Sequence, residues 1–175
     1  MFFTELETNR LLLRNMIPDD REFIYRHFSD TQINKYLFDA EPVTDMKEAD
    51  EIIEFYRQLE PRMWHRWIII EKESGIPIGT CGFHCWVQKA RTCDVGYDLA
   101  SNYWGKGYMN EAMKAILNFS ETKMNIKEIR ACIYPDNHAS IRVALKLGFV
   151  WNGEMKDEIF RGEKYPHQIL KLKIT

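Results

Sequence analysis

The sequence predicts one α/β domain spanning residues 1–175, and three observations support that prediction. A meander of three antiparallel strands is expected between residues 67 and 99. The clearest helical pattern follows it directly, and a further strand and helix come next. The chain also shows no repeat, linker or shift of composition, and its length is usual for one domain of about 150 residues. A chain of this length buries a core without help from disulfides or metal ions.

The first expected elements alternate between strand and helix. Thr8–Arg14 is a short apolar run flanked by charge, which favours a strand. Pro18–Asp20 supplies a helix start, and helical spacing follows it. Apolar residues recur at helical spacing again from Asp45 to Leu59, and Pro61 ends that pattern. We expect this second helix to pack on one face only.

Two polar turns separate three apolar segments and so predict the meander. Lys72–Gly75 joins the segments Trp67–Ile70 and Ile76–Trp86, which is typical of a hairpin. Gln88–Arg91 then leads into Asp94–Leu99. Because successive side chains of a strand point to opposite faces, this last strand divides into an apolar and a polar set. The two sets are Val95, Tyr97 and Leu99 on one face and Asp94, Gly96 and Asp98 on the other.

A helix of about four turns is predicted to begin just after Gly107. Its apolar residues are spaced by three and four positions, and they are Met109, Ala112, Met113, Ile116 and Leu117, with Ser120 at the end. No other segment of the chain shows this periodicity over such a length.

A strand, a helix and two further strands are expected in the last third of the chain. Lys127–Tyr134 alternates like a strand, and Pro135–Asn137 ends it and caps the helix. The helix is expected to stop at Gly148. Its expected buried residues are Ile141, Ala144 and Leu145. Phe149–Trp151 and Ile169–Leu172 are the last strand candidates.

The composition excludes several classes of function. The 24 basic and 26 acidic residues give a formal charge of −2, whereas binders of bulk nucleic acid or anionic membranes carry a basic excess. No apolar run approaches the ~20 residues that cross a bilayer, and Met1–Glu5 lacks the basic start of a signal peptide. We therefore expect a cytoplasmic protein that binds neither nucleic acid nor membrane.

The four cysteines, Cys81, Cys85, Cys93 and Cys132, do not predict a metal centre. None forms the CxxC pair used by structural zinc sites and thioredoxin-like motifs. His84 lies between the first two, but in a strand it would point to the face opposite both sulfur atoms. We expect buried, reduced thiols and no metal.

Gly105 and Gly107 lie in the most informative segment, between the last strand of the meander and the long helix. Two glycines let the backbone come close to a ligand, and the free amides of the first helical turn favour an anion. Lys106 adds positive charge to the loop. A pair of glycines also serves simply to shape a tight turn, but the whole segment favours a phosphate ligand.

Two nucleotide-binding motifs do not fit this loop. A Walker A loop requires glycine five residues before Gly105, where Ala100 stands. A dinucleotide fingerprint requires a third glycine where Asn110 stands, although Glu128 lies at a suitable distance for a ribose contact. Hairpins, rather than βαβ units, also precede the loop. An NAD(P)-dependent oxidoreductase is therefore the less favoured alternative.

Three segments resemble one family. Asp98–Ala112 is similar to the acetyl-coenzyme A pyrophosphate loop of the GNAT N-acetyltransferase superfamily, in its RimJ/RimL-like (ribosomal-protein-alanine N-acetyltransferase-like) branch. Asn137–Phe149 resembles the second signature of that branch, and Thr8–Arg14 resembles its amino-terminal opening. The resemblance implies a mixed, mostly antiparallel central sheet with helices on both faces. Departures are Trp104, where the superfamily usually has Arg or Gln, and Met109, where it has Gly or Ala.

The resemblance implies an acetyl-CoA-dependent N-acetyltransferase. Its acceptor would be a primary amine, either the N-terminal α-amine of a protein or peptide or a small-molecule amine, which attacks the thioester directly. The pantetheine arm would pair with the backbone of one strand, and the pyrophosphate would lie on the loop amides. The implied coenzyme-binding residues are Tyr97, Asp98, Leu99, Trp104, Gly105, Lys106, Gly107, Tyr108 and Asn137.

Two residues are candidates for catalysis. An α-amine with a pKa of roughly 7.7–8.0 is partly protonated at neutral pH, so a base is needed. Asp94 is the first candidate for that base, directly or through water, with Asp98 and His84 as alternatives. Ser140 matches the serine that would donate to the leaving thiolate. Many relatives carry a tyrosine acid where this chain has Ala144, so that role must move or be absent.

Two questions stay open at this point. The missing tyrosine leaves room for a non-catalytic coenzyme A-binding or sensing module. The segment between Asp30 and Trp67 is expected to line the acceptor site, and it holds several rings without naming the acceptor: Tyr36, Phe38, Tyr56, Trp64 and His65. The oligomeric state is likewise open.

Overall fold

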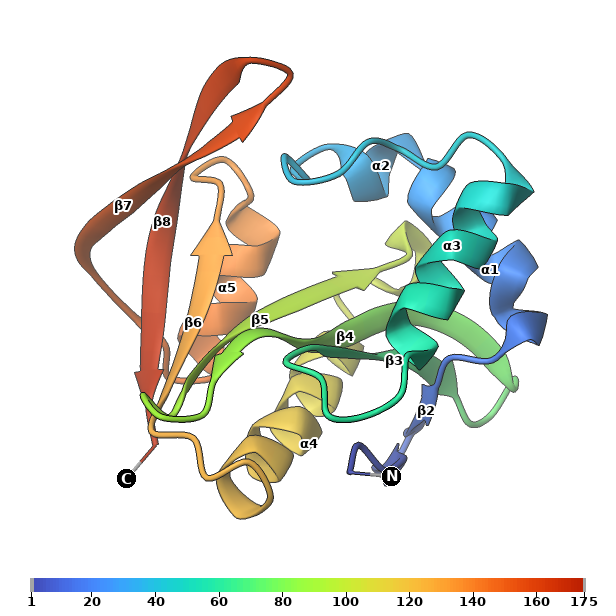
Figure 1. The fold of residues 1–175 in the computed structure, drawn as a ribbon, viewed down its shortest axis with the longest axis horizontal. Coiled ribbons are helices and arrows are strands. Elements are labelled where there is room, and N and C mark those ends of the chain that lie inside the picture. The colour runs from blue at the N-terminus through green and yellow to red at the C-terminus, as the bar shows by residue number, and fades with distance from the viewer. Residues whose placement is uncertain (1, 175) are drawn as a thin grey trace.

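Eight strands form one mixed sheet in the computed structural model, which describes residues 2–174 (Figure 1). The strand order is β1-β2-β3-β4-β5-β6-β8-β7. The β5–β6 pair is parallel, and the other neighbouring pairs described are antiparallel. The strands are β1 (Leu6–Glu7), β2 (Leu11–Asn15), β3 (His65–Glu71), β4 (Ile76–Val87), β5 (Thr92–Leu99), β6 (Glu128–Ile133), β7 (Val150–Phe160) and β8 (Glu163–Lys173).

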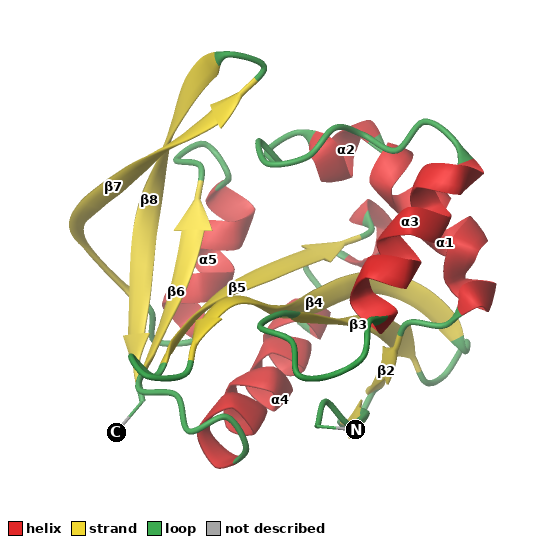
Figure 2. Ribbon diagram, viewed as in Figure 1, coloured by secondary structure: helices red, strands yellow, loops and turns green. Residues whose placement is uncertain are grey.

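Helices cover both faces of this sheet (Figure 2). They are α1 (Arg21–Ser29), α2 (Thr31–Asn34), α3 (Met46–Arg57), α4 (Tyr108–Thr122) and α5 (His138–Lys146), with short 3-10 turns at Pro18–Asp20 and Ser101–Tyr103. The mixed, mostly antiparallel sheet with helices on both faces is the architecture expected. No helix in residues 2–174 is both long enough and apolar enough to cross a membrane.

Two apolar cores lie on the two faces. On one face α4 and α5 pack against the sheet, with Met113, Ile116 and Ala144 fully buried. On the other face α1 and α3 pack against β3, with Ile24 and Ile53 fully buried. Alternation of side chains along β3 feeds both cores, as a strand between two helical layers requires.

The predicted meander is confirmed as β3, β4 and β5, with antiparallel register throughout. Close approach of the strands explains one glycine within it. A Cβ atom on Gly82 would lie 2.0 Å from the carbonyl oxygen of His65, which no side chain tolerates. The faces of β5 also divide as predicted: Val95 and Tyr97 face the α4 core, while Asp98 meets polar groups on the other face.

β5 and β6 pair only at their first residues. The matched pairs are Thr92 with Glu128, Cys93 with Ile129, and Asp94 with Arg130. Beyond Asp94 the two strands diverge (Figure 1), so the backbone of β5 from residue 95 to residue 99 has no strand partner on that side. This splayed segment leads directly into the glycine loop.

The last two strands are longer than predicted. The sequence indicated Phe149–Trp151 and Ile169–Leu172, but β7 and β8 form a hairpin of 11 residues each, joined by a turn at Arg161 and Gly162 with positive φ. Most of β7 is exposed, so its side chains lack the alternation that marks a half-buried strand. The expected burial of Leu145 is also wrong, because its side chain is 53% exposed and Leu147 packs against the core instead.

Candidate active site

A cavity of about 500 Å³ opens where β5 leaves β6. Its walls come from the end of β5, the glycine loop, the first turns of α4 and α5, and the segment around α2. Of the residues expected to bind coenzyme, the cavity is lined by Tyr97, Asp98, Leu99, Trp104, Gly105, Gly107, Tyr108 and Asn137. Lys106 does not line it, although its loop does. The structure therefore brings together residues from three separate stretches of sequence.

The glycine loop has the backbone conformation that its sequence suggested. Gly105 and Gly107 have φ values of 75° and 81°, a region that disfavours other residues. The second glycine directly precedes α4, so the first amides of that helix open onto the loop. The indole of Trp104 donates a hydrogen bond to the carbonyl oxygen of Leu99 at 2.5 Å, which ties the loop to the end of β5.

The first turn of α5 forms the opposite wall. The side-chain oxygen of Asn137 caps this helix by accepting from the amide of Ser140 at 3.2 Å. Tyr97 reaches across from β5, and its hydroxyl donates to the carbonyl oxygen of Ser140 at 3.0 Å. Burial raises the pKa of Tyr97, so its hydroxyl stays protonated at neutral pH. The side chain of Ser140 borders the cavity beside these groups.

Sequence reasoning missed a basic stripe on α5. His138, Arg142 and Lys146 recur every four residues, and all three line the cavity. Their helical spacing behind Asn137 was the available signal. The cationic side chains of Arg142 and Lys146, in one cavity with the glycine loop, suit a ligand with several phosphate charges.

The carboxylate of Asp98 is held by other protein groups. Arg66 Nη1 donates to its Oδ2 at 2.7 Å, Thr80 Oγ1 lies 2.8 Å from both oxygens, and His27 Nε2 lies 2.6 Å from Oδ1. Although burial opposes ionisation, the neighbouring His27 and Arg66 lower the pKa of Asp98. A carboxylate this fully engaged is poorly placed to take a proton from a substrate, so its contribution to the cavity is its backbone.

Asp94 lies outside the cavity lining, on the polar face of β5. It is 8% exposed, and its Oδ1 accepts from Arg130 Nε at 2.7 Å. Its neighbour across the strand pair is His84, which is exposed. Partial desolvation lowers the pKa of His84, while the charge of Asp94 opposes that shift. These two groups form a polar cluster at the point where β5 and β6 part.

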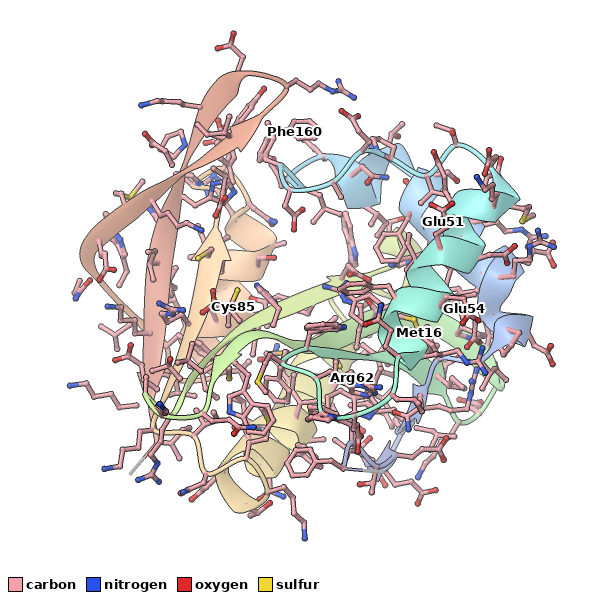
Figure 3. The ribbon with its side chains drawn as sticks, viewed as in Figure 1. Met16, Glu51, Glu54, Arg62, Cys85 and Phe160 are labelled. Carbon is pink, nitrogen blue, oxygen red and sulfur yellow. The ribbon has the colours of Figure 1, made fainter. Side chains whose placement is uncertain are left out.

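The cysteines give a mixed result. Cys81 and Cys93 are buried and Cys132 is partly buried, but Cys85, which is labelled in Figure 3, is exposed, so the expectation of buried thiols is wrong for it. The strand register shifts after His84, and Cys85 has a φ of 50°, which turns this part of β4 away from regular pairing. Within residues 2–174 no three His, Cys, Asp or Glu side chains are grouped to hold a metal ion.

Aromatic rings connect the segment after α2 with the β7–β8 hairpin. Phe38 stacks on Tyr165 with ring centroids 4.0 Å apart and lies 4.9 Å from Tyr134. Tyr36 stacks on Tyr134 at 6.0 Å and also lines the cavity. Phe160, at the end of β7, points toward the same segment (Figure 3). This aromatic bridge lies beside the splayed strands.

The other rings of the acceptor-side segment have packing contacts. Trp64 stacks on Phe55 at 5.0 Å, and His65 is 1% exposed, with Arg62 Nη2 2.8 Å from its Nδ1. Burial lowers the pKa of His65 to about 3, so the ring is neutral. His65 therefore belongs to the core rather than to a site.

Comparison with known proteins decides the family. A model described as the acetyltransferase (GNAT) domain matches residues 10–150. The N-acetyltransferase p20 of Bacillus licheniformis, itself uncharacterised, is 35% identical over 153 residues, which are 87% of this chain and 85% of that protein. The chain belongs to the GNAT acetyltransferase family. As a GNAT enzyme it uses acetyl-CoA to transfer an acetyl group, so the non-catalytic and NAD(P)-dependent alternatives are not retained.

This GNAT acetyltransferase is also similar to two enzymes named for the acetylation of ribosomal proteins. The ribosomal protein uS5-alanine N-acetyltransferase of Escherichia coli is 26% identical over 175 residues, covering 94% of this chain and 88% of the relative. RimL, a ribosomal L7/L12 α-N-protein acetyltransferase solved with coenzyme A, has a TM-score of 0.87 at 19% identity, with 98% of each chain covered. The second likeness shows that the GNAT fold is shared.

Proposed function

We propose that this enzyme acetylates a primary amine, with the N-terminal α-amine of a protein or peptide as the first candidate and a small-molecule amine as the second. The observation that carries this proposal is the unpaired stretch of β5 after Asp94, which opens onto a cavity shared with the glycine loop and the start of α5. A coenzyme placed there has a strand edge, loop amides and a helix N-terminus within one cavity.

The amide and phosphate groups of the coenzyme each have matching groups of the protein in the cavity. The amides of the pantetheine arm pair with the backbone of residues 97–99, extending the sheet where β6 has turned away. The pyrophosphate lies on the amides from Trp104 to Tyr108, and the basic stripe of α5 faces it across the cavity. Asn137, whose oxygen caps α5, contacts the coenzyme from the same turn.

The reaction then requires one proton acceptor for the amine and one hydrogen-bond donor to the leaving thiolate. The amine nitrogen attacks the thioester carbonyl carbon, the carbon–sulfur bond breaks, and the sulfur leaves as a thiolate. Asp94 takes the amine proton directly or through water, with the exposed His84 as the alternative. The hydroxyl of Ser140 donates to the developing thiolate. Ala144 has a methyl side chain with no proton to donate, so no acid acts from its position.

The charges near the polar cluster favour an acceptor with a single ammonium group. The carboxylates of Asp94, Asp98 and Glu158 are each paired with a cation, as Arg130, Arg66 and Lys156 respectively are their partners. Asp39 is exposed, acts electrostatically on His84, and has no ion pair in the described residues. One unpaired carboxylate can pair with the single ammonium group of an α-amine, whereas a polyamine carries several ammonium groups.

An acceptor panel tests this proposal. Release of free thiol from acetyl-CoA is followed with peptides bearing free or blocked α-amines, with monoamines and with spermidine, and products are analysed by mass spectrometry. We expect turnover with free α-amines or monoamines and none with α-blocked peptides that lack lysine. Preference for spermidine contradicts the proposed acceptor class. Absence of turnover with every amine, despite coenzyme binding, contradicts the proposed reaction.

The free thiols support a proposal for the cellular location. We propose that the enzyme works in the cytoplasm, because all four cysteines are free and one of them is exposed, which suits a reducing compartment.

A further inference from the structure

No residue of the amino-terminal segment Thr8–Arg14, whose sequence resembles the family's opening, has a role in the reaction described above. Its third residue, Arg10, lies against the glycine loop although 96 residues separate it from Lys106. Nη1 of Arg10 donates to the carbonyl oxygen of Lys106 at 3.0 Å. That peptide carbonyl stands between the two loop glycines, which are the least constrained residues of the loop.

Arg10 also contacts the first turn of α4. Its guanidinium carbon lies 4.3 Å from the ring centroid of Tyr108, and its Nη2 lies 3.6 Å from the place that a Cβ atom would take on Gly107. Nε donates to Oε2 of Glu111 at 2.7 Å. One side chain therefore contacts the loop, the residue that begins the helix and the residue one turn further on.

Glu111 completes the arrangement from the helix side. Its Oε1 accepts from the backbone amide of Arg10 at 2.8 Å and from the hydroxyl of Thr8 at 2.6 Å. Although partial burial opposes ionisation, these bonds and the guanidinium keep the pKa of Glu111 below its usual value. An ionised carboxylate in the first turn of α4 would repel a bound anion, and the charge of Arg10 offsets it.

Arg10 is itself anchored at the backbone. Its carbonyl oxygen accepts from the amide of Lys72, and the neighbouring turn is closed by a hydrogen bond from the amide of Thr8 to the carbonyl oxygen of Leu11, both at 2.9 Å. The guanidinium therefore extends to the glycine loop from a backbone position that is held by hydrogen bonds and directly precedes β2.

We propose that Arg10 and Glu111 are positioning residues that hold the glycine loop in the shape that binds the pyrophosphate, and so make the enzyme depend on the nucleotide half of acetyl-CoA. This inference rests on the proposed placement of the coenzyme. Lysine at position 10 keeps the charge but cannot join Glu111, the carbonyl oxygen of Lys106 and the ring of Tyr108 at once.

Two acetyl donors separate positioning from general stability. Acetyl-CoA carries the pyrophosphate, and S-acetylpantetheine has the same thioester arm without it. In R10K and E111Q we expect kcat/KM for acetyl-CoA to fall about tenfold, mainly through KM, because a hydrogen bond to a charged group is worth about that factor. In the same variants, kcat/KM for S-acetylpantetheine should change by less than about twofold. R21K, which alters the exposed ion pair with Asp50, is the matched control for both donors.

The outcomes are distinct. Equal losses for both donors would assign Arg10 to the fold alone, and unchanged values for both would remove the positioning role; either result overturns the inference. G107A, which strains a residue at φ 81°, tests the coenzyme placement separately. If kcat/KM falls for acetyl-CoA but not for S-acetylpantetheine in G107A, and R10K shows no such difference, the placement of the coenzyme stands and the role of Arg10 is wrong. If neither variant discriminates between the donors, the placement itself is wrong.

Discussion

The hydroxyl of Tyr97 donates a hydrogen bond to the carbonyl oxygen of Ser140 at 3.0 Å. This bond joins β5 to the first turn of α5 across the opening that β5 and β6 leave. It fixes the distance between the strand edge that would take the pantetheine arm and the serine that would meet the sulfur. The side chain of Tyr97 therefore links the two walls of the proposed coenzyme site.

Removal of that hydrogen bond should weaken coenzyme binding without abolishing it. In Y97F the carbonyl oxygen of Ser140 loses its donor, and we expect the free energy of unfolding to fall by about 1 kcal/mol. KM for acetyl-CoA should rise because α5 is less well held. Urea denaturation and steady-state kinetics measure the two effects. An unchanged stability together with unchanged KM would show that the bond positions nothing.

Asp94 should be required for the rate and less for the fold. In D94N we expect kcat to fall about 100-fold, the usual scale for loss of a general base. R130Q removes the same ion pair but leaves the carboxylate, so it should keep most of kcat. Equal losses in D94N and R130Q would assign Asp94 a structural role. A loss confined to H84Q would transfer the base to His84.

Ser140 should act on the leaving group. In S140A we expect kcat to fall roughly 10- to 100-fold, because a hydrogen bond to a charged sulfur is worth about 1.5–3 kcal/mol, while KM for acetyl-CoA changes little. N137A is the comparison, since it removes the α5 cap and should lower the free energy of unfolding by about 1 kcal/mol. If S140A instead resembles N137A in stability and keeps kcat, the hydroxyl has no part in catalysis.

The free energy of unfolding should decrease at acidic pH, because the stabilising contribution of ionised Asp98 is lost there. Its pKa in the folded protein lies below its ordinary value, so it contributes stability above about pH 4, and that contribution is lost as the pH falls through the folded pKa. D98N leaves Arg66 and His27 without their carboxylate and should cost about 3 kcal/mol at pH 7. D98N should also reduce the difference between the free energies of unfolding at pH 7 and pH 3, which denaturation at both pH values would measure. E22Q, which breaks an exposed pair with Arg26, should leave both unchanged.

Local patterns were enough to predict most of the fold. The spacing of apolar residues after Gly107 indicated α4, and the polar turns between apolar segments indicated β3, β4 and β5, because both signals lie within short stretches of sequence. The β7–β8 hairpin was underestimated because residues 150–157 of β7 are exposed without a break and show no alternation of apolar and polar faces. Leu145 was misplaced because helical spacing does not reveal how far around α5 the core extends.

The parts of the site that lie within one continuous segment were predictable from the sequence. The glycine loop and the Asn137 cap are local features, and both lie in the cavity. The partners of Asp98 were not predictable, since Arg66, Thr80 and His27 come from three elements. Contacts of this kind are set by the register of the sheet and the packing of α1, which no single stretch of sequence encodes.

The three-pair contact between β5 and β6 has a consequence for handling the protein. Without coenzyme, the backbone of residues 95–99 is an unsatisfied template to which a foreign strand can add, and such templates promote aggregation. A ligand that fills the gap is thermodynamically linked to folding, and at a free concentration of 100 Kd it adds about 2.7 kcal/mol. If the pantetheine arm pairs with this edge as proposed, purification with coenzyme A present should raise Tm and solubility together, with the co-substrate acting as the missing strand of the sheet.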